Sequence, residues 1–178
     1  HASAIYGGSE FALSYGGNEM AGYHTGPAAH LGLLLGARHS HLDNAGYSVD
    51  QKIVMKKQTT PREIVDRIFE EEQWRQVLSS LVICFFARGI YTPEVVSETL
   101  GSAGFALSPD ELSSIGKKIH FEKYAFKFRE GFKLQEERLP GRIFETMSSA
   151  GRIDADFMKQ AVEYAESVLG AAGAEESK

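Results

Sequence analysis

The strongest constraint on the fold is a start signal that occurs three times, each time directly before a segment with helical spacing of apolar residues. In each case a hydroxyl residue is followed by proline, at Thr60-Pro61, Thr92-Pro93 and Ser108-Pro109. A serine or threonine side chain caps the free N–H groups at the start of a helix, and proline suits its first position. We therefore predict helices from residue 61 to about 87, from 93 to 101 and from 109 to about 132.

A fourth helix is predicted after Asp154, which stands in a capping position before an apolar stripe that runs to Val168. We expect this helix to end at Gly170. In the helix after Ser108, apolar residues fall on two faces, which predicts a helix buried between neighbours. No stretch keeps the two-residue alternation of a strand. The predicted fold class is therefore all-α and multihelical.

The first third of the chain differs from the rest in amino-acid composition. Residues 1–60 are rich in Gly, Ala and Ser and hold five of the six histidines. Two similar pieces, Tyr6-Gly7-Gly8 and Tyr15-Gly16-Gly17, indicate two glycine turns around a short extended piece. We expect an irregular Gly-rich segment over residues 1–60, a helical domain over 61–170 and a frayed tail over 171–178.

Composition excludes several classes of protein. The 19 Lys and Arg residues are outnumbered by 24 Asp and Glu, so the net charge is −5 and no nucleic-acid partner is expected. No apolar run approaches the about 20 residues of a membrane-spanning helix, so no membrane partner is expected either. The single cysteine excludes an internal disulfide framework and fits a reducing compartment, which we take to be the cytoplasm. The chain begins at His1 without a signal peptide, so we expect a piece of a longer protein.

Cys84 lies in the apolar run around Leu81 to Phe86, which the helical spacing places near the end of the helix that starts at Pro61. One interpretation is a buried thiol that packs as a small hydrophobe on the same face as Val77. The other is a thiolate that ligates a metal centre whose remaining ligands come from elsewhere, as in an iron–sulfur cluster. The local pattern does not separate the two.

The segment around Arg38 carries a second set of candidate groups. His39, His41 and Asp43 stand at alternate positions, so in an extended segment their side chains would point the same way and could bind zinc or non-haem iron. Alternatively, one histidine is a general acid–base group beside an arginine that holds an anion, or the residues belong to a polar surface loop. Motifs for nucleotide hydrolysis and serine hydrolases are absent from the sequence.

Taken together, several segments resemble one family. The chain is similar to the C-terminal signature of the aldehyde ferredoxin oxidoreductase family in three ordered segments, Ile115–Ile119, Phe126–Phe132 and Leu139–Arg142. Upstream, Cys84-Phe85 resembles the last cluster cysteine of that family, and the stretch from Leu31 to Leu42 resembles its histidine-bearing segment. The resemblance spans most of residues 10–145.

This resemblance implies a tungsten or molybdenum bis-pyranopterin and a 4Fe–4S cluster, both shared with an N-terminal domain of the same enzyme outside this chain. It also implies oxidation of aldehydes or related carbonyl compounds, with ferredoxin as electron acceptor and a possible homo-oligomer. Residues 1–60 would line the cofactor site.

The resemblance also assigns residues to roles. Cys84 becomes the remaining cluster ligand, and His41, or else His39, becomes the proton-transfer residue near the metal. Arg38 would shape the wall of the site. Ser79 and Ile83 would contact the pterin, although the family usually carries an aspartate where this chain has Ser79.

Two alternatives to the family interpretation stay open. The chain could be a non-catalytic helical interaction module, for which Ser79 in place of an aspartate is the best support. It could also be a small enzyme with a mononuclear metal site on His39, His41 and Asp43. In the family interpretation, the isolated chain should be inactive, because it offers only one of the four thiolates that a 4Fe–4S cluster needs.

Overall fold

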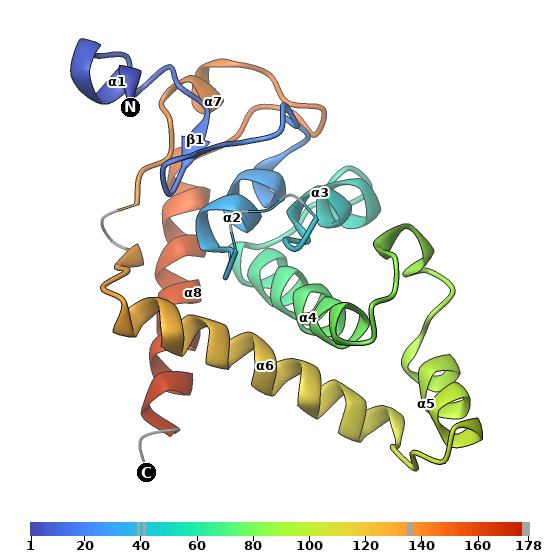
Figure 1. Cartoon of the computed structure of the whole chain (residues 1–178). Helices are drawn as coiled ribbons and strands as arrows, with labels where there is room; N and C mark the ends of the chain where they lie inside the picture. Colours follow the sequence, from blue (N-terminus) through green and yellow to red (C-terminus); the bar gives the residue numbers. More distant parts are fainter. Residues whose placement is uncertain (39, 41, 135–136, 176–178) are drawn as a thin grey trace.

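The computed structural model describes residues 1–38, 40, 42–134 and 137–175, which form a multihelical fold with one short hairpin (Figure 1). The predicted all-α class is confirmed. The α-helices are α1 (Ala2–Tyr6), α2 (Pro27–Leu35), α3 (Gly46–Val49), α4 (Pro61–Ser80), α5 (Pro93–Ser102), α6 (Pro109–Arg129), α7 (Arg142–Glu145) and α8 (Ala155–Glu175). The other elements are a π-helical turn η1 (Asp50–Val54), a 3₁₀ turn η2 (Phe85–Ala87) and the antiparallel strands β1 (Ser14–Tyr15) and β2 (Asn18–Glu19).

Three long helices make the frame of the molecule. Helices α4, α6 and α8 pack against one another, and α2 contacts both α4 and α8. In Figure 1, α6 crosses below α4 and reaches α5 at the far right, while α2 and α3 lie above α4. None of the helices in the described ranges is long and apolar enough to span a lipid bilayer.

All four predicted helix starts are confirmed by their caps. The side-chain oxygens of Thr60, Thr92 and Ser108 each accept a hydrogen bond from the backbone N–H three residues later, at 3.2, 3.4 and 3.2 Å. The Asp154 carboxylate accepts one from Phe157 N at 2.7 Å. The two predicted glycine turns are also present, since Gly7, Gly8, Gly16 and Gly17 all have positive φ.

The prediction for the end of α4 was wrong. The helix ends at Ser80 rather than near residue 87, because Val82 adopts a left-handed φ of 58° and the N–H of Ile83 turns back to the carbonyl of Leu78 at 2.9 Å. Cys84 therefore lies outside the helix and is exposed, so the interpretation as a buried thiol was also wrong.

Helix α6 is buried in part on each of the two faces that the sequence pattern predicts. Its buried stripe consists of Leu112, Gly116, His120 and Tyr124. Of the two predicted stripes, Phe121 and Phe132 pack against the core beside Tyr124, whereas Ile115 of the first stripe is 40% and Phe128 of the second 37% exposed. Gly116 explains the close approach to α4, because a Cβ atom there would overlap the carbonyl oxygen of Gln73. At the end of the chain, α8 passes the expected stop at Gly170, since a single glycine costs a helix only about 1 kcal/mol.

Helix α2 lies at the centre of the core, inside the segment that the sequence pattern describes as irregular. Every residue from Ala28 to Leu35 is buried. A helix buried all round carries no polar face, so its periodicity gives no signal in the sequence. Helix α3 crosses α2 in direct backbone contact, because Gly46 leaves no room for a Cβ atom against the Ala28 carbonyl.

Both ends of α2 are capped by side chains from distant parts of the chain. At its start, the Asp50 carboxylate accepts hydrogen bonds from Ala28 N at 3.0 Å and Ala29 N at 2.9 Å, and from the Thr25 hydroxyl at 2.9 Å. At its end, the Tyr124 hydroxyl donates to Leu35 O at 2.6 Å and Lys127 Nζ donates to Gly36 O at 2.9 Å. The free backbone groups of a helix need such partners when they are buried.

The crossing of α2 and α3 gives the first prediction. Gly46→Ala should lower the free energy of unfolding by about 3 kcal/mol, because the new methyl group forces two backbones apart. Gly170→Ala is the matched control: its Cβ would meet nothing within 4 Å, so it should raise stability by about 0.5–1 kcal/mol. Urea denaturation of both variants measures these changes. Equal effects would contradict the close crossing.

A second prediction concerns Asp50. Burial raises the pKa of this carboxyl from its ordinary 3.8 to about 6, against the lowering effect of its three hydrogen-bond donors. The folded state therefore binds the proton of Asp50 more tightly than the unfolded state. The contribution of this proton to the free energy of unfolding is lost as pH rises from about 4 to about 6. Relative to Asp50→Asn, which cannot ionise, the free energy of unfolding of the wild type should fall by up to about 3 kcal/mol over that range. Urea titrations at several pH values test this, and a relative gain of stability with rising pH would contradict it.

Candidate functional site

The structure places the predicted site residues in two segments. Cys84 is exposed between α4 and η2, Ile83 beside it is half-buried, and Ser79 is exposed in the last turn of α4. In the loop between α2 and α3, Arg38 is exposed and its Nε lies 3.1 Å from Asp43 Oδ2. His39 and His41 lie outside the described residues, so their assignment stays a prediction.

Arg75 of α4 fixes the downstream half of this loop. Its side chain is only 5% exposed. One guanidinium nitrogen, Nη1, donates to the backbone carbonyl of Leu42 at 2.9 Å and also to that of Asn44. The other, Nη2, donates to Ser48 Oγ at 2.9 Å and to Glu71 Oε1 at 2.8 Å. Leu42 directly follows His41, so a buried charge anchors the chain next to the predicted proton-transfer residue.

Arg88 ties the cysteine segment to the same point. Its Nη2 donates to Ser48 Oγ at 3.1 Å, and its Nη1 donates to the carbonyl of Phe85 at 2.7 Å. The Ser48 hydroxyl thus accepts from both arginines, which uses its two lone pairs. Because Phe85 directly follows Cys84, one hydroxyl links the turn that carries Cys84 to the loop that Arg75 holds.

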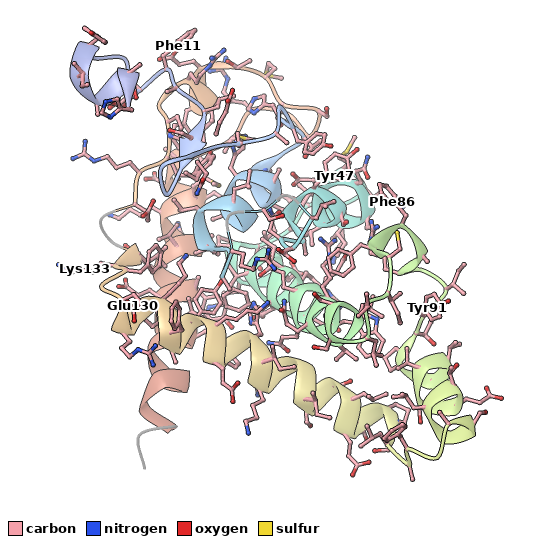
Figure 2. The ribbon with its side chains drawn as sticks, in the orientation of Figure 1. Phe11, Tyr47, Phe86, Tyr91, Glu130 and Lys133 are labelled. Carbon is pink, nitrogen blue, oxygen red and sulfur yellow. The ribbon has the colours of Figure 1, made fainter. Side chains whose placement is uncertain are left out.

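A cavity of about 150 Å³ separates these two segments. Its walls include Leu42 from the loop, Phe85 and Phe86 from η2, and the paired rings of Tyr23 and Tyr47, whose centroids lie 4.6 Å apart. Tyr47 and Phe86 are labelled in Figure 2 on the neighbouring segments that border it. The two predicted functional segments, more than 40 residues apart in sequence, therefore share one largely apolar cavity.

Glu72 holds the end of the loop. Its Oε1 accepts from Ala45 N at 3.0 Å, and its Oε2 accepts from His120 Nε2 of α6 at 3.1 Å. Both side chains are buried. The sequence analysis missed Glu72, Arg75 and Arg88. A signal did exist for two of them, because Glu72 and Arg75 continue the buried spacing of Ile68, a pattern that apolar residues alone do not show.

Two histidines of the first segment have a structural role. The Tyr15 hydroxyl lies 2.7 Å from His30 Nδ1, His30 Nε2 lies 2.8 Å from His24 Nδ1, and His24 Nε2 lies 3.1 Å from the Thr146 carbonyl. A carbonyl only accepts, so when His24 is neutral each group in this chain donates to the next. Burial, and then the charge of His24, lower the pKa of His30 to about 4, which keeps it neutral at physiological pH. The chain of bonds joins the hairpin to α2 and to the residue after α7.

No group of three or more His, Cys, Asp or Glu side chains arranged for a metal occurs among the described residues. The mononuclear alternative needs His39 and His41, which lie outside them, and its third ligand, Asp43, is paired with Arg38. That alternative therefore stays a prediction.

The Ser48 link yields a third prediction. Ser48→Ala leaves a buried N–H of Arg75 and a partly buried N–H of Arg88 without their shared acceptor, and should lower the free energy of unfolding by about 1–3 kcal/mol. Ser102→Ala removes an exposed hydroxyl that bonds only to Glu98 O, and should change stability by less than about 0.5 kcal/mol. Hydrogen exchange should become faster at the amides of Asn44 and Ala45 only in the Ser48 variant. Unchanged exchange there would show that the loop does not depend on this hydroxyl.

Comparison with known proteins gives one match. The family model described as aldehyde ferredoxin oxidoreductase, domains 2 and 3, matches residues 1–168. No curated protein and no solved structure matches the chain.

Proposed function

Because the chain belongs to the aldehyde ferredoxin oxidoreductase family, as its domains 2 and 3, we propose that it forms the C-terminal part of an enzyme that oxidises aldehydes or related carbonyl compounds. Electrons would leave through a 4Fe–4S cluster to ferredoxin. The observation that carries the proposal is the exposed Cys84 thiol beside a cavity that also borders the loop of the predicted proton-transfer histidine.

The residues around Cys84 suit a cluster ligand. Cys84 lies in extended backbone, two residues after Val82 with its left-handed φ. The apolar side chains on either side of it are exposed, Val82 by 91% and Phe86 by 90%. A cluster needs accessible thiolates and a dry wall, and this turn offers both once another domain covers it. One thiolate of four fits a cluster shared with the N-terminal domain.

The pterin would meet the exposed end of α4. Ser79 offers a hydroxyl that can donate and accept hydrogen bonds, and Ile83 offers an apolar contact. The serine lacks the charge of the aspartate usual in the family. When bound, the tungsten or molybdenum pterin would supply two-electron oxidation chemistry, and the cluster would supply one-electron transfer.

The residues of the chain itself supply positioning and proton handling. When an aldehyde and a water molecule give a carboxylic acid, two protons and two electrons, His41, or else His39, would take up one of the protons, since an imidazole exchanges protons near neutral pH. Arg38 would line the wall beside it. Arg75 and Glu72 hold the loop by hydrogen bonds to Leu42 O and Ala45 N, and aromatic rings line the cavity between the loop and the segment of Cys84.

The partners follow from the exposed surface. Val82, Phe86 and Ile90 form an exposed apolar stretch, which we assign to the N-terminal domain as its cover. We further propose ferredoxin as electron acceptor, a cytoplasmic location and possible self-association of the complete enzyme. The second candidate, a non-catalytic interaction module, is favoured by Ser79 in the aspartate position.

The test, and the fourth prediction, uses this chain together with the N-terminal domain. Cys84→Ser should abolish the electron paramagnetic resonance signal of the reduced cluster, because a hydroxyl is a far poorer iron ligand than a thiolate. His41→Ala, or His39→Ala if that residue is the base, should lower kcat for aldehyde oxidation by about 100-fold or more. Lys159→Gln on the exposed side of α8 is the control for both measurements.

The outcomes separate the two candidates. A wild-type assembly without cluster, metal or aldehyde oxidation would favour the interaction module. A cluster that survives in Cys84→Ser would overturn the assignment of this thiol, even if the assembly is active.

A further inference from the structure

A second, larger cleft lies on the other side of the two arginines. It has a volume of about 580 Å³ and is bounded by η1, α4, the segment 88–93 and one residue of α6, Ser113. This volume falls within the range of about 300–1,000 Å³ that is usual for small-molecule sites. Neither the predicted metal ligands nor the predicted histidine loop contributes to it, so the proposed function gives it no role.

One part of the cleft wall is apolar and rigid. Val49, Ile53 and Pro93 contribute aliphatic surface, and Trp74 contributes its indole. The indole N–H donates to the Tyr91 carbonyl at 3.0 Å, which fixes the ring (Tyr91 is labelled in Figure 2). A fixed aromatic surface of this kind suits the flat or aliphatic body of a ligand.

The other part of the wall carries excess positive charge. Four cations line it, Lys52, Arg67, Arg75 and Arg88, against two carboxylates, Glu70 and Glu71. The Glu71 carboxylate is shared by three of the cations, at 2.8 Å from Arg75, 3.2 Å from Lys52 and 3.8 Å from Arg88. One carboxylate cannot neutralise three cations. This local excess stands out in a chain whose net charge is −5.

Two unsatisfied donors strengthen the positive potential. The Nε atoms of Arg75 and Arg88 are buried and have no hydrogen-bond acceptor in the described part of the protein. Buried N–H groups normally have a hydrogen-bond acceptor, and Arg88 Nε has only the long ion pair to Glu71, so these two donors favour a negative group in the cleft.

We propose that this cleft binds a small organic anion with an apolar body, of the class of aryl or alkyl carboxylates. The apolar body lies against Trp74 and the carboxylate faces the cluster of cations. Inorganic phosphate has the charge but no body for the apolar wall, and a neutral amide has the body but no charge. These two probes therefore separate the parts of the proposal.

The first experiment uses the only tryptophan of the chain as reporter. Trp74 fluorescence of the isolated protein is titrated with phenylacetate, phenylacetamide and inorganic phosphate. Phenylacetate should give a saturable change, with at least tenfold weaker binding of the amide and of phosphate. No saturable change, equal binding of the amide, or tighter binding of phosphate would each overturn the proposal.

Matched variants test the position of the site. Lys52→Glu should weaken phenylacetate binding at least tenfold, whereas Lys57→Glu should change it less than twofold. Both lysines are 58% exposed and each pairs with one glutamate, but only Lys52 lines the cleft. Ser113→Phe, at an exposed position of α6, should block the cleft without unfolding the protein. Equal effects of the two lysine variants, or full binding in Ser113→Phe, would contradict the site. No cofactor takes part, so the outcome does not depend on the proposed oxidoreductase function.

Discussion

A helix with no solvent-facing side can exist only if the backbone groups at its two ends find partners inside the protein. Helix α2 meets this condition through Asp50 at its start and through Tyr124 and Lys127 at its end. The placement also suits the helix dipole, with a carboxyl group at the positive end and an ammonium group at the negative end. The turn η1 and helix α6 are thereby held to α2 by hydrogen bonds as well as by packing.

Helix α4 extends the same principle to the candidate site. Its inward face carries Glu72 and Arg75 where a simple amphipathic helix would carry apolar residues. Buried charges are costly unless each of them is paired and hydrogen-bonded, and here the partners are the backbone groups of the loop from Leu42 to Ala45. The free energy that keeps these charges paired therefore also keeps the loop in place. Removing any one partner leaves a buried charge with an unmade hydrogen bond in an apolar interior.

The sequence was sufficient for features that depend on neighbouring residues. The Thr-Pro and Ser-Pro starts, the Asp154 cap and the glycine turns are local, and the structure confirms them. Family membership was also predicted correctly, because it rests on the order of several motifs. The end of α4 was not predictable, since a β-branched residue such as Val82 rarely adopts a left-handed conformation.

Features that depend on distant contacts stayed hidden. Helix α2 has no periodic signal because all its sides are covered, and α6 leaves Ile115 and Phe128 of its two predicted stripes exposed in the part of the chain that the structure describes. The two segments of the candidate site were proposed from the sequence. Their contact through Ser48 requires Arg75 and Arg88, which the sequence pattern alone would place on the surface.

The contact between Gly46 and the Ala28 carbonyl has a further consequence for variation in this chain. Helices α2 and α3 cannot slide past each other, so the ten residues from 36 to 45 bridge two immovable anchor points. An inserted or deleted residue cannot be absorbed by a shift of either helix, and Arg75 and Glu72 hold Leu42 to Ala45, so the change must fall on the part of the bridge before Leu42. Length polymorphism there would alter the distance from the histidines to Cys84 while the scaffold around it stays intact. Such a bridge allows reactivity to diverge without loss of the fold.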